Sequence, residues 1–278
     1  MADEPRVEEG SWPAADGAQL WYRRWQPATP QRSVVLLHGF GEHGGRYDSL
    51  ARLLTAHGLS VTAVDFRGHG RSSGRRGHIA HFSQYLDDIG SVLDRVRSSG
   101  QEQLVLFGHS FGGLVAVHVA LRFPAAFSRL VIQSPLFEVG FPVPRWKECV
   151  ARGLRWWPTL TLPSGLDPRG LSRDAVVAEE YRRDPWVHDR ISVCAYHEIR
   201  RAMTDAVVRA EQLALPTLLL FGSDDLIVSP AACRSFGQRL RCPHRIIEYP
   251  GGYHELHHER VREDVAAAIA SWSLANDA

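Results

Sequence analysis

The feature that most constrains the fold of this chain is a series of six short apolar segments separated by longer, more polar stretches. Most are rich in valine, leucine or isoleucine, and all are bounded by glycine, proline or polar residues. Such runs are typical of strands that are buried on both faces of a parallel sheet. The predicted strands are residues 33–39, 59–66, 103–110, 129–135, 216–225 and 244–252.

Helical patterns alternate with these strands, because apolar residues recur there every three or four positions. The predicted helices are residues 47–57, 85–98, 114–123, 231–240 and 260–274. Strand and helix in alternation predict an α/β fold with a mostly parallel, doubly wound sheet. An earlier segment, 18–25, alternates in polarity and is predicted to form an antiparallel edge strand.

One long stretch interrupts the alternation, since residues 136–203 contain no candidate for a buried strand. The stretch is rich in proline and tryptophan. We interpret it as a largely helical cap over the carboxyl ends of the strands, where open α/β sheets bind their ligands. The predicted organisation is a core of residues 1–135 and 206–278 with a cap at 136–205. The alternative is an insertion that only protects the sheet.

Composition narrows the classes of function. A formal net charge of +1 gives no reason to expect a nucleic-acid partner. The acidic N-terminal residues lack the features of a signal peptide, and no apolar run approaches the roughly 20 residues that span a bilayer. The four cysteines form no C-x-x-C pair and are expected to be free thiols. We therefore expect a cytoplasmic protein, and we expect no cofactor.

Residues 108–112, Gly-His-Ser-Phe-Gly, fit the pattern G-x-S-x-G between a predicted strand and a predicted helix. In this context the serine lies in a sharp turn that exposes its hydroxyl above the sheet. The flanking glycines remove side chains that would collide with the neighbouring backbone. Ser110 is therefore the candidate nucleophile, and it needs a base to take its proton.

The expected order of a triad on this architecture is serine, then an acid, then histidine. Asp224 and Asp225 follow the strand at 216–225, and we choose Asp225 because the Leu-Ile-Val after it can pack inward and hold it. His254 follows the last strand and is the candidate base. The acid would fix the histidine tautomer and stabilise the imidazolium.

The same histidine begins the sequence His254-Glu255-Leu-His-His258, which also fits the zinc-binding pattern H-E-x-x-H. The zinc interpretation needs both histidines on one helical face and a third ligand. The upstream Pro-Gly-Gly argues that His254 lies in a loop, and zinc leaves the Gly-His-Ser-Phe-Gly turn unexplained. We therefore expect no metal, with Glu255 and His258 in the polar start of the final helix.

An attack on a carbonyl also requires donors for the developing oxyanion. One is expected from the amide of Phe111, directly after the nucleophile. The other is expected from Phe40, in the loop after the strand at 33–39, where Gly39 and Gly41 permit unusual dihedral angles. His38 is interpreted as a residue that braces this loop.

With these residues in place the chain resembles the α/β-hydrolase superfamily over nearly its whole length. More narrowly, it is similar to the monoacylglycerol lipase and lysophospholipase group. The match is carried by the segments HGFGEHGGRY, DFRGHGRSSG, GHSFGG, YRRDP, GSDDLIVSP and GGYHELHH. The resemblance implies that the amide of Phe40 helps to bind the oxyanion, and that four residues lie near the glycerol of a monoacylglycerol: Glu42, Arg46, Tyr181 and His257.

Other interpretations of these residues remain open. Glu42 and Arg46 could form a local ion pair that steadies the loop, and Tyr181 could serve cap packing. Phe40 and Phe111 are bulkier than the residues usual in the group and are expected to narrow the acyl entrance.

We expect a serine esterase that acts on monoacylglycerols, a small-molecule lipid ester substrate. The alternatives are a lysophospholipase, a carboxylesterase or an aminopeptidase of the same fold, or a non-catalytic protein that binds a ligand. The Trp- and Arg-rich residues 144–158 suggest peripheral membrane contact through the cap, and a buried cap helix is the competing interpretation.

Overall fold

A central sheet of eight strands organises the molecule in a computed structural model that describes residues 4–98, 104–141 and 153–275. The strand order is β1-β2-β4-β3-β5-β6-β9-β10, and all pairs from β4 to β10 are parallel. The six predicted strands are confirmed, and five of them are buried. The prediction of a buried strand at 244–252 was wrong, because β10 lies at the edge of the sheet and its residues are exposed or half-buried. The strands are β1 (Arg6–Pro13), β2 (Gln19–Gln26), β3 (Arg32–Leu37), β4 (Leu59–Val64), β5 (Leu104–His109), β6 (Arg129–Gln133), β9 (Thr217–Gly222) and β10 (His244–Tyr249).

The prediction for residues 18–25 was wrong in one respect, because β2 is antiparallel but does not lie at the edge. β1 pairs along its whole length with β2 and forms the edge instead. Its sequence is mostly polar, so it carries little apolar signal. Cross-strand pairs stabilise β1 in place of apolar burial. Glu9 lies opposite Arg23, and their side chains form an ion pair with an N–O distance of 3.3 Å.

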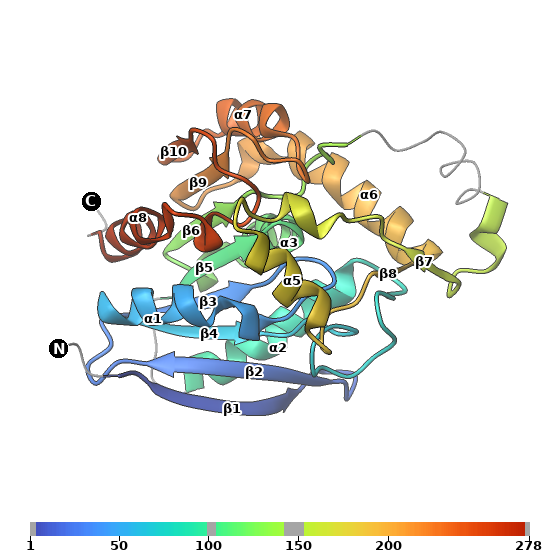
Figure 1. Cartoon of the computed structure of the whole chain (residues 1–278). Helices are drawn as coiled ribbons and strands as arrows, with labels where there is room; N and C mark the ends of the chain where they lie inside the picture. Colours follow the sequence, from blue (N-terminus) through green and yellow to red (C-terminus); the bar gives the residue numbers. More distant parts are fainter. Residues whose placement is uncertain (1–3, 99–103, 142–152, 276–278) are drawn as a thin grey trace.

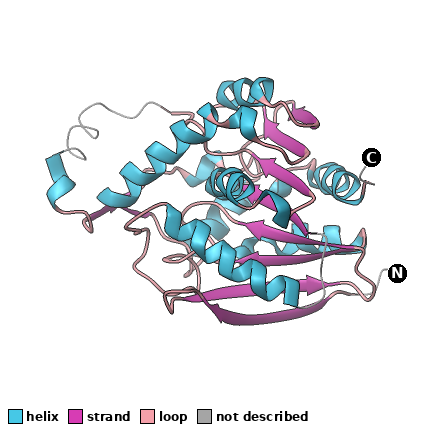
Figure 2. Ribbon diagram, turned by 180° about the vertical axis from the view of Figure 1, so that it is seen from behind, coloured by secondary structure: helices cyan, strands magenta, loops and turns pink. Residues whose placement is uncertain are grey.

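Helices cover both faces of the sheet, as a doubly wound arrangement requires. Figure 1 labels them, and Figure 2 gives the view from behind. Residues of α1 and α8 pack into one apolar core, and residues of α2, α3 and α7 pack into the other. The helices are α1 (Asp48–Ala56), α2 (Ser83–Ser98), α3 (Phe111–Arg122), α5 (Ala175–Arg183), α6 (Val193–Val208), α7 (Pro230–Arg239) and α8 (Arg262–Leu274). Short 3-10 turns are η1 (Gly44–Tyr47), η2 (Pro124–Ala126), η3 (Leu154–Trp156), η4 (Pro168–Gly170), η5 (Ala210–Gln212) and η6 (Leu256–His258).

The described part of the predicted cap holds α5, most of α6 and a small antiparallel pair, β7 (Thr161–Pro163) and β8 (Arg190–Ser192). Cap residues reach the loops that follow the core strands. The amide of His188 donates to Gly41 after β3 at 2.8 Å, and Leu171 accepts from the amide of Glu255 after β10 at 2.7 Å. Because α6 continues to Val208, no break falls at residue 205, and the division into core and cap stays a prediction.

Two expectations from composition can be compared with the structure. Within the described ranges, no helix has the length and apolar character needed to cross a membrane. Cys194, Cys233 and Cys242 are free thiols, as expected, and Cys149 lies outside the described residues.

Candidate active site

Ser110 occupies the turn between β5 and α3 with φ 53° and ψ −117°, a conformation that is strained for a residue with a side chain. The turn is tight. A Cβ built on Gly108 would lie 2.3 Å from the carbonyl oxygen of Gly112, and one on Gly112 would lie 2.1 Å from that of Leu37. The prediction that the flanking glycines avoid collisions is therefore confirmed.

Asp225 and His254 meet although they are far apart in the sequence. Nδ1 of His254 lies 2.8 Å from Oδ2 of Asp225, and both side chains are buried. The other oxygen, Oδ1, accepts from the amides of Ile227 and Val228 at 2.8 and 3.0 Å. Burial would lower the pKa of His254, but the Asp225 carboxylate raises it above its ordinary value. The alternative acid, Asp224, is exposed and pairs with Arg173.

The H-E-x-x-H pattern does not form a zinc-binding helix. His254 precedes the 3-10 turn η6 and turns its Nδ1 to Asp225. Among the described residues, two clusters could hold a metal ion: one consists of Glu255, His257 and His258, the other of Glu42, His109 and Glu255. Glu255 and His258 share one cluster, but neither cluster includes His254, so the two histidines of that pattern do not come together in a metal-binding cluster.

The loop after β3 lies beside the serine, since a Cβ built on Gly39 would lie 3.5 Å from Cβ of Ser110. Oε1 of Glu42 accepts from the amide of Gly39 at 2.6 Å, and Gly41 has φ +81°. The loop that carries Phe40 therefore lies beside the nucleophile, and the donor role of the Phe40 amide stays a prediction. His38 has the predicted bracing position, because its Nε2 accepts from the amide of Phe66 at 3.0 Å.

The two phenylalanines differ in their surroundings. Phe111 is fully buried in the apolar core, with ring centroids 5.4 Å from Phe66 and 5.2 Å from Tyr85. Its ring packs within the core, and a narrowing of the acyl entrance by Phe111 stays a prediction. Phe40 is only partly buried and packs edge-on against Phe111 and against His188 of the cap.

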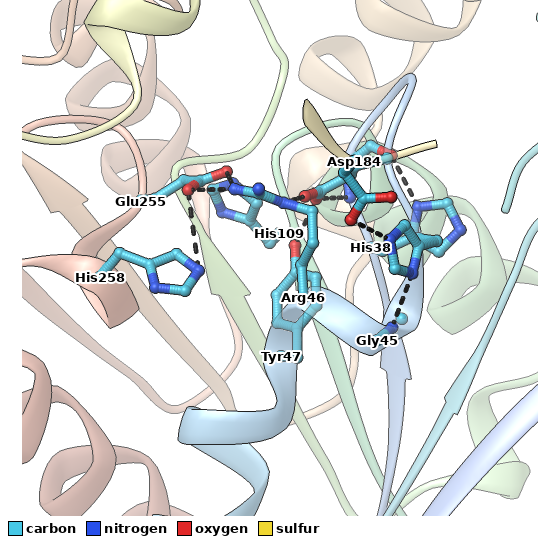
Figure 3. A network of polar contacts seen from close by, with 12 residues as sticks. His38, Gly45, Arg46, Tyr47, His109, Asp184, Glu255 and His258 are labelled. Carbon is cyan, nitrogen blue, oxygen red and sulfur yellow. Dashed lines mark hydrogen bonds and ion pairs between the residues drawn. The ribbon is translucent and has the colours of Figure 1, made fainter. Parts of the chain in front are cut away.

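A buried ionic network lies next to these loops (Figure 3). Arg46 donates through Nε to Glu42 at 2.7 Å and through Nη2 to both oxygens of Glu255 at 2.7 and 2.6 Å. Burial would raise the pKa of Glu42, but the Arg46 guanidinium and other neighbours lower it to about 2. The predicted ion pair within the loop is therefore real, and Arg46 binds a second carboxylate that sequence reasoning had assigned to a helix start.

The four residues predicted to bind glycerol come together around this network. The Arg46 guanidinium lies over the ring of Tyr181 at 4.8 Å. Tyr47 donates to Glu42 at 2.6 Å and stacks on His257 with ring centroids 4.7 Å apart. These contacts also fit the competing interpretations of loop bracing and cap packing, so the binding roles stay predictions.

Two residues of this region, His109 and Gln133, were not singled out by sequence reasoning, and a third, Glu255, was assigned to the start of the final helix. The ring of His109 lies 4.7 Å from that of His254. Nε2 of Gln133 contacts Nδ1 of both His109 and His257. One signal was available, because Gln133 is a polar residue at the end of an otherwise apolar strand. For Glu255 no local signal existed, since its partner Arg46 lies 209 positions away.

Comparisons with known proteins agree with this geometry. Residues 28–261 match the family Hydrolase_4, described as serine aminopeptidase, S33. A monoacylglycerol lipase of Mycolicibacterium smegmatis is 30% identical over 96% of this chain and 97% of its own length. An uncharacterized abhydrolase domain-containing protein of Dictyostelium discoideum is 32% identical over 93% of this chain, which spans only 28% of that protein. The crystal structure of Paleococcus ferrophilus monoacylglycerol lipase superimposes with a TM-score of 0.82 at 36% identity, covering 91% of this chain and 98% of that one. The predicted α/β-hydrolase fold is thereby confirmed.

Proposed function

Because the chain belongs to the Hydrolase_4 family of serine hydrolases, we propose that it cleaves the ester bond of monoacylglycerols to release glycerol and a fatty acid. The observation that carries the proposal is the buried 2.8 Å hydrogen bond between His254 and Asp225 at the carboxyl edge of the sheet that also presents Ser110. The likeness to two monoacylglycerol lipases supports the choice of substrate.

In the proposed reaction His254 removes the proton of Ser110, whose Oγ attacks the ester carbonyl. The amides of Phe40 and Phe111 donate to the oxyanion, and Asp225 stabilises the imidazolium. The tetrahedral intermediate collapses as His254 passes its proton to the glycerol oxygen. Water, activated by the same histidine, then cleaves the acyl-enzyme and restores Ser110.

The cluster of Glu42, Arg46, Tyr181 and His257 is proposed to hold the glycerol hydroxyls. It offers carboxylate acceptors, guanidinium donors and a phenol within one buried region, a combination suited to a small polyol. The same groups could hold other polar heads, so a lysophospholipid is the second candidate. A panel of monoacylglycerols and lysophospholipids of equal chain length would separate the two.

The family description also names a further candidate activity, that of a serine aminopeptidase. Recognition of a free substrate amine would need a carboxylate that is not already neutralised by the protein. The carboxylates of Glu42, in this cluster, and of Glu255, beside it, are both buried, and Arg46 pairs with both. This pairing favours a neutral alcohol over a cationic amine.

The first test is replacement of the nucleophile. Ser110→Ala should lower kcat for a monoacylglycerol by at least about 10⁴-fold, because the acyl-enzyme cannot form. It should also abolish labelling by a fluorophosphonate probe. Ser91→Ala, at a half-buried position on α2, serves as the matched control and should leave both unchanged. Near-normal hydrolysis by Ser110→Ala would refute the mechanism.

We also propose that the protein reaches its lipid by peripheral membrane contact. Residues 144–152 of the predicted interfacial stretch lie outside the described residues. In the remainder, Trp156 is 92% and Trp157 is 67% exposed. Trp156 ends the 3-10 turn η3, and Trp157 follows it. Exposed tryptophans are suited to the interface between lipid head groups and acyl chains.

The double variant Trp156→Ser/Trp157→Ser should reduce co-sedimentation with phosphatidylcholine vesicles, because the interfacial rings are lost. Hydrolysis of a water-soluble ester should be unaffected. Val208→Ser removes an exposed apolar side chain at the end of α6 and should bind vesicles like the wild type. Unchanged co-sedimentation of the double variant would exclude this membrane contact.

A further inference from the structure

Gln133 is the last residue of β6 and is completely buried. In the sheet it lies opposite His109 of β5 and Leu220 of β9. Side chains of directly opposed residues point to the same face of a sheet, so the amide of Gln133 lies beside the imidazole of His109. A polar side chain at such a position requires partners, because an unpaired buried amide is costly.

The partners of Gln133 are two histidines from different segments. Its Nε2 lies 3.2 Å from Nδ1 of His109 and 2.8 Å from Nδ1 of His257. The ring of His109 lies between two others, with centroids 4.7 Å from His254 and 5.1 Å from His257. Gln133 therefore links His109, which lies beside the proposed base His254, to His257 of the proposed glycerol site.

This arrangement has a consequence for the protons on the two rings. In this orientation of the amide, Oε1 of Gln133 is buried without a partner among the described residues and Nε2 faces the two rings. An amide nitrogen carries two hydrogens and cannot accept, so in this orientation both Nδ1 atoms are acceptors. Burial and nearby positive charge hold the pKa of His109 and the pKa of His257 well below the ordinary value, so both rings are neutral near pH 7. A neutral ring that accepts at Nδ1 carries its proton on Nε2.

One of these protons lacks a partner. Among the described residues, Nε2 of His257 is buried without a hydrogen-bond acceptor. Buried donors in this condition are rare in folded proteins, and each calls for an explanation. An oxygen of a bound substrate would satisfy it.

We propose that Gln133 is a positioning residue that fixes His109 and His257 in the Nε2–H tautomer, so that His257 offers a donor to an alcohol oxygen of the substrate. The identity of that alcohol rests on the proposed function, whereas the tautomers do not. Rotation of the amide by half a turn would present its oxygen and place both protons on Nδ1, which is the outcome that contradicts the proposal.

Ring nitrogen shifts distinguish the two states without any reference to activity. Long-range ¹H–¹⁵N spectra of the protein labelled on histidine should show both rings as Nε2–H in the wild type at pH 7.5. Signals are assigned from their loss in His109→Gln and His257→Gln. Wild-type spectra with both rings as Nδ1–H would overturn the proposal, even if no variant of Gln133 can be purified.

Two variants of Gln133 then test its role. Gln133→Met preserves length without a donor and should free at least one ring to populate the Nδ1–H tautomer. Gln133→Glu presents acceptor oxygens and should move both rings to Nδ1–H or to the charged form. Gln31→Met, an exposed glutamine, is the control and should leave the spectrum unchanged. Identical ring shifts in wild type, Gln133→Met and Gln133→Glu would refute a positioning role.

Kinetics show whether the tautomer matters for the substrate. Gln133→Met should lower kcat/KM for a monoacylglycerol roughly tenfold, as expected for the loss of one hydrogen bond, and chiefly through KM. Hydrolysis of p-nitrophenyl acetate, which has no glycerol, should change much less. An equal loss on both esters would contradict the link to the alcohol. A wild type that cleaves p-nitrophenyl acetate but no monoacylglycerol would refute the proposed substrate and leave the tautomer result standing.

Discussion

Two kinds of buried histidine lie side by side at the carboxyl end of the sheet, and the partner of each ring decides its charge. His254 faces the Asp225 carboxylate, which outweighs burial and raises the pKa of His254. His109 is in ring contact with His254. Burial and His254 lower the pKa of His109 and outweigh the Glu42 carboxylate, which would raise it. The site therefore combines one ring that readily takes a proton with another that stays neutral.

The raised pKa of His254 predicts the pH at which kcat/KM begins to fall on the acid side of its pH profile. Catalysis needs the neutral imidazole, so kcat/KM should begin to fall at a pH above the ordinary histidine value of about 6.5. Asp225→Asn should move this limb to lower pH and reduce the rate on the order of 10⁴-fold. The control Asp224→Asn should keep the limb in place, because Asp224 is exposed and pairs with Arg173. An unmoved limb in Asp225→Asn would contradict the assignment of the acid.

At the scale of elements, the turn from β5 to α3 depends on how closely α3 approaches β3. The backbone of Gly112 lies against the carbonyls of Leu37 and His38, so the first turn of the helix rests on the end of the neighbouring strand. This close approach brings the loop that follows β3 to Ser110. Packing of elements, rather than the motif alone, sets the distance between the nucleophile and the proposed oxyanion donors.

Gly112→Ala should therefore be destabilising. Its new Cβ would lie 2.1 Å from a backbone oxygen that cannot rotate away, so α3 has to shift. We expect a loss of about 1–3 kcal/mol in the free energy of unfolding, measured by urea titration, together with reduced activity. Gly153→Ala is the matched control, because its Cβ would have no atom within 4 Å and its φ of −65° suits alanine. Equal stability of the two variants would contradict the packing argument.

At the scale of the whole molecule, buried neutral histidines make the fold sensitive to acid. Five such rings lie in the described core: His38, His69, His109, His118 and His257. In each of the five cases burial is the main cause that lowers the pKa below its ordinary value. The unfolded chain binds protons on these rings below about pH 6.5 and the folded chain does not, so the free energy of unfolding falls as the pH drops through that value.

Urea titrations at pH 7.5, 6.5 and 5.5 should show this loss. Each ring that stays neutral contributes up to about 1.4 kcal/mol per pH unit below its unfolded pKa. His69→Gln should lower the number of protons taken up on unfolding by about one and so flatten the pH dependence of the free energy of unfolding. His81→Gln, at an exposed position, should leave this dependence unchanged. Stability that stays constant down to pH 5.5 would show that the buried rings take up protons without cost.

Much of the architecture was predictable because it is encoded locally. The buried strands of the core, the helices between them and the G-x-S-x-G turn follow from apolar periodicity and from glycine placement. The edge strand β1 was missed, because a polar strand is stabilised by pairing with β2 rather than by a pattern of its own. The prediction that Glu255 begins the final helix was wrong, since α8 begins at Arg262 and Glu255 is buried.

The sequence by itself determined the parallel sheet and the candidate nucleophile, because each depends on residues close together in the chain, and the order of acid and base followed from the expected architecture. Only the tertiary structure showed that Asp225 meets His254, that Arg46 bridges Glu42 and Glu255, and that Gln133 joins His109 to His257. The physical reason is that a buried polar group must find its partner in space, and the fold brings those partners from distant segments.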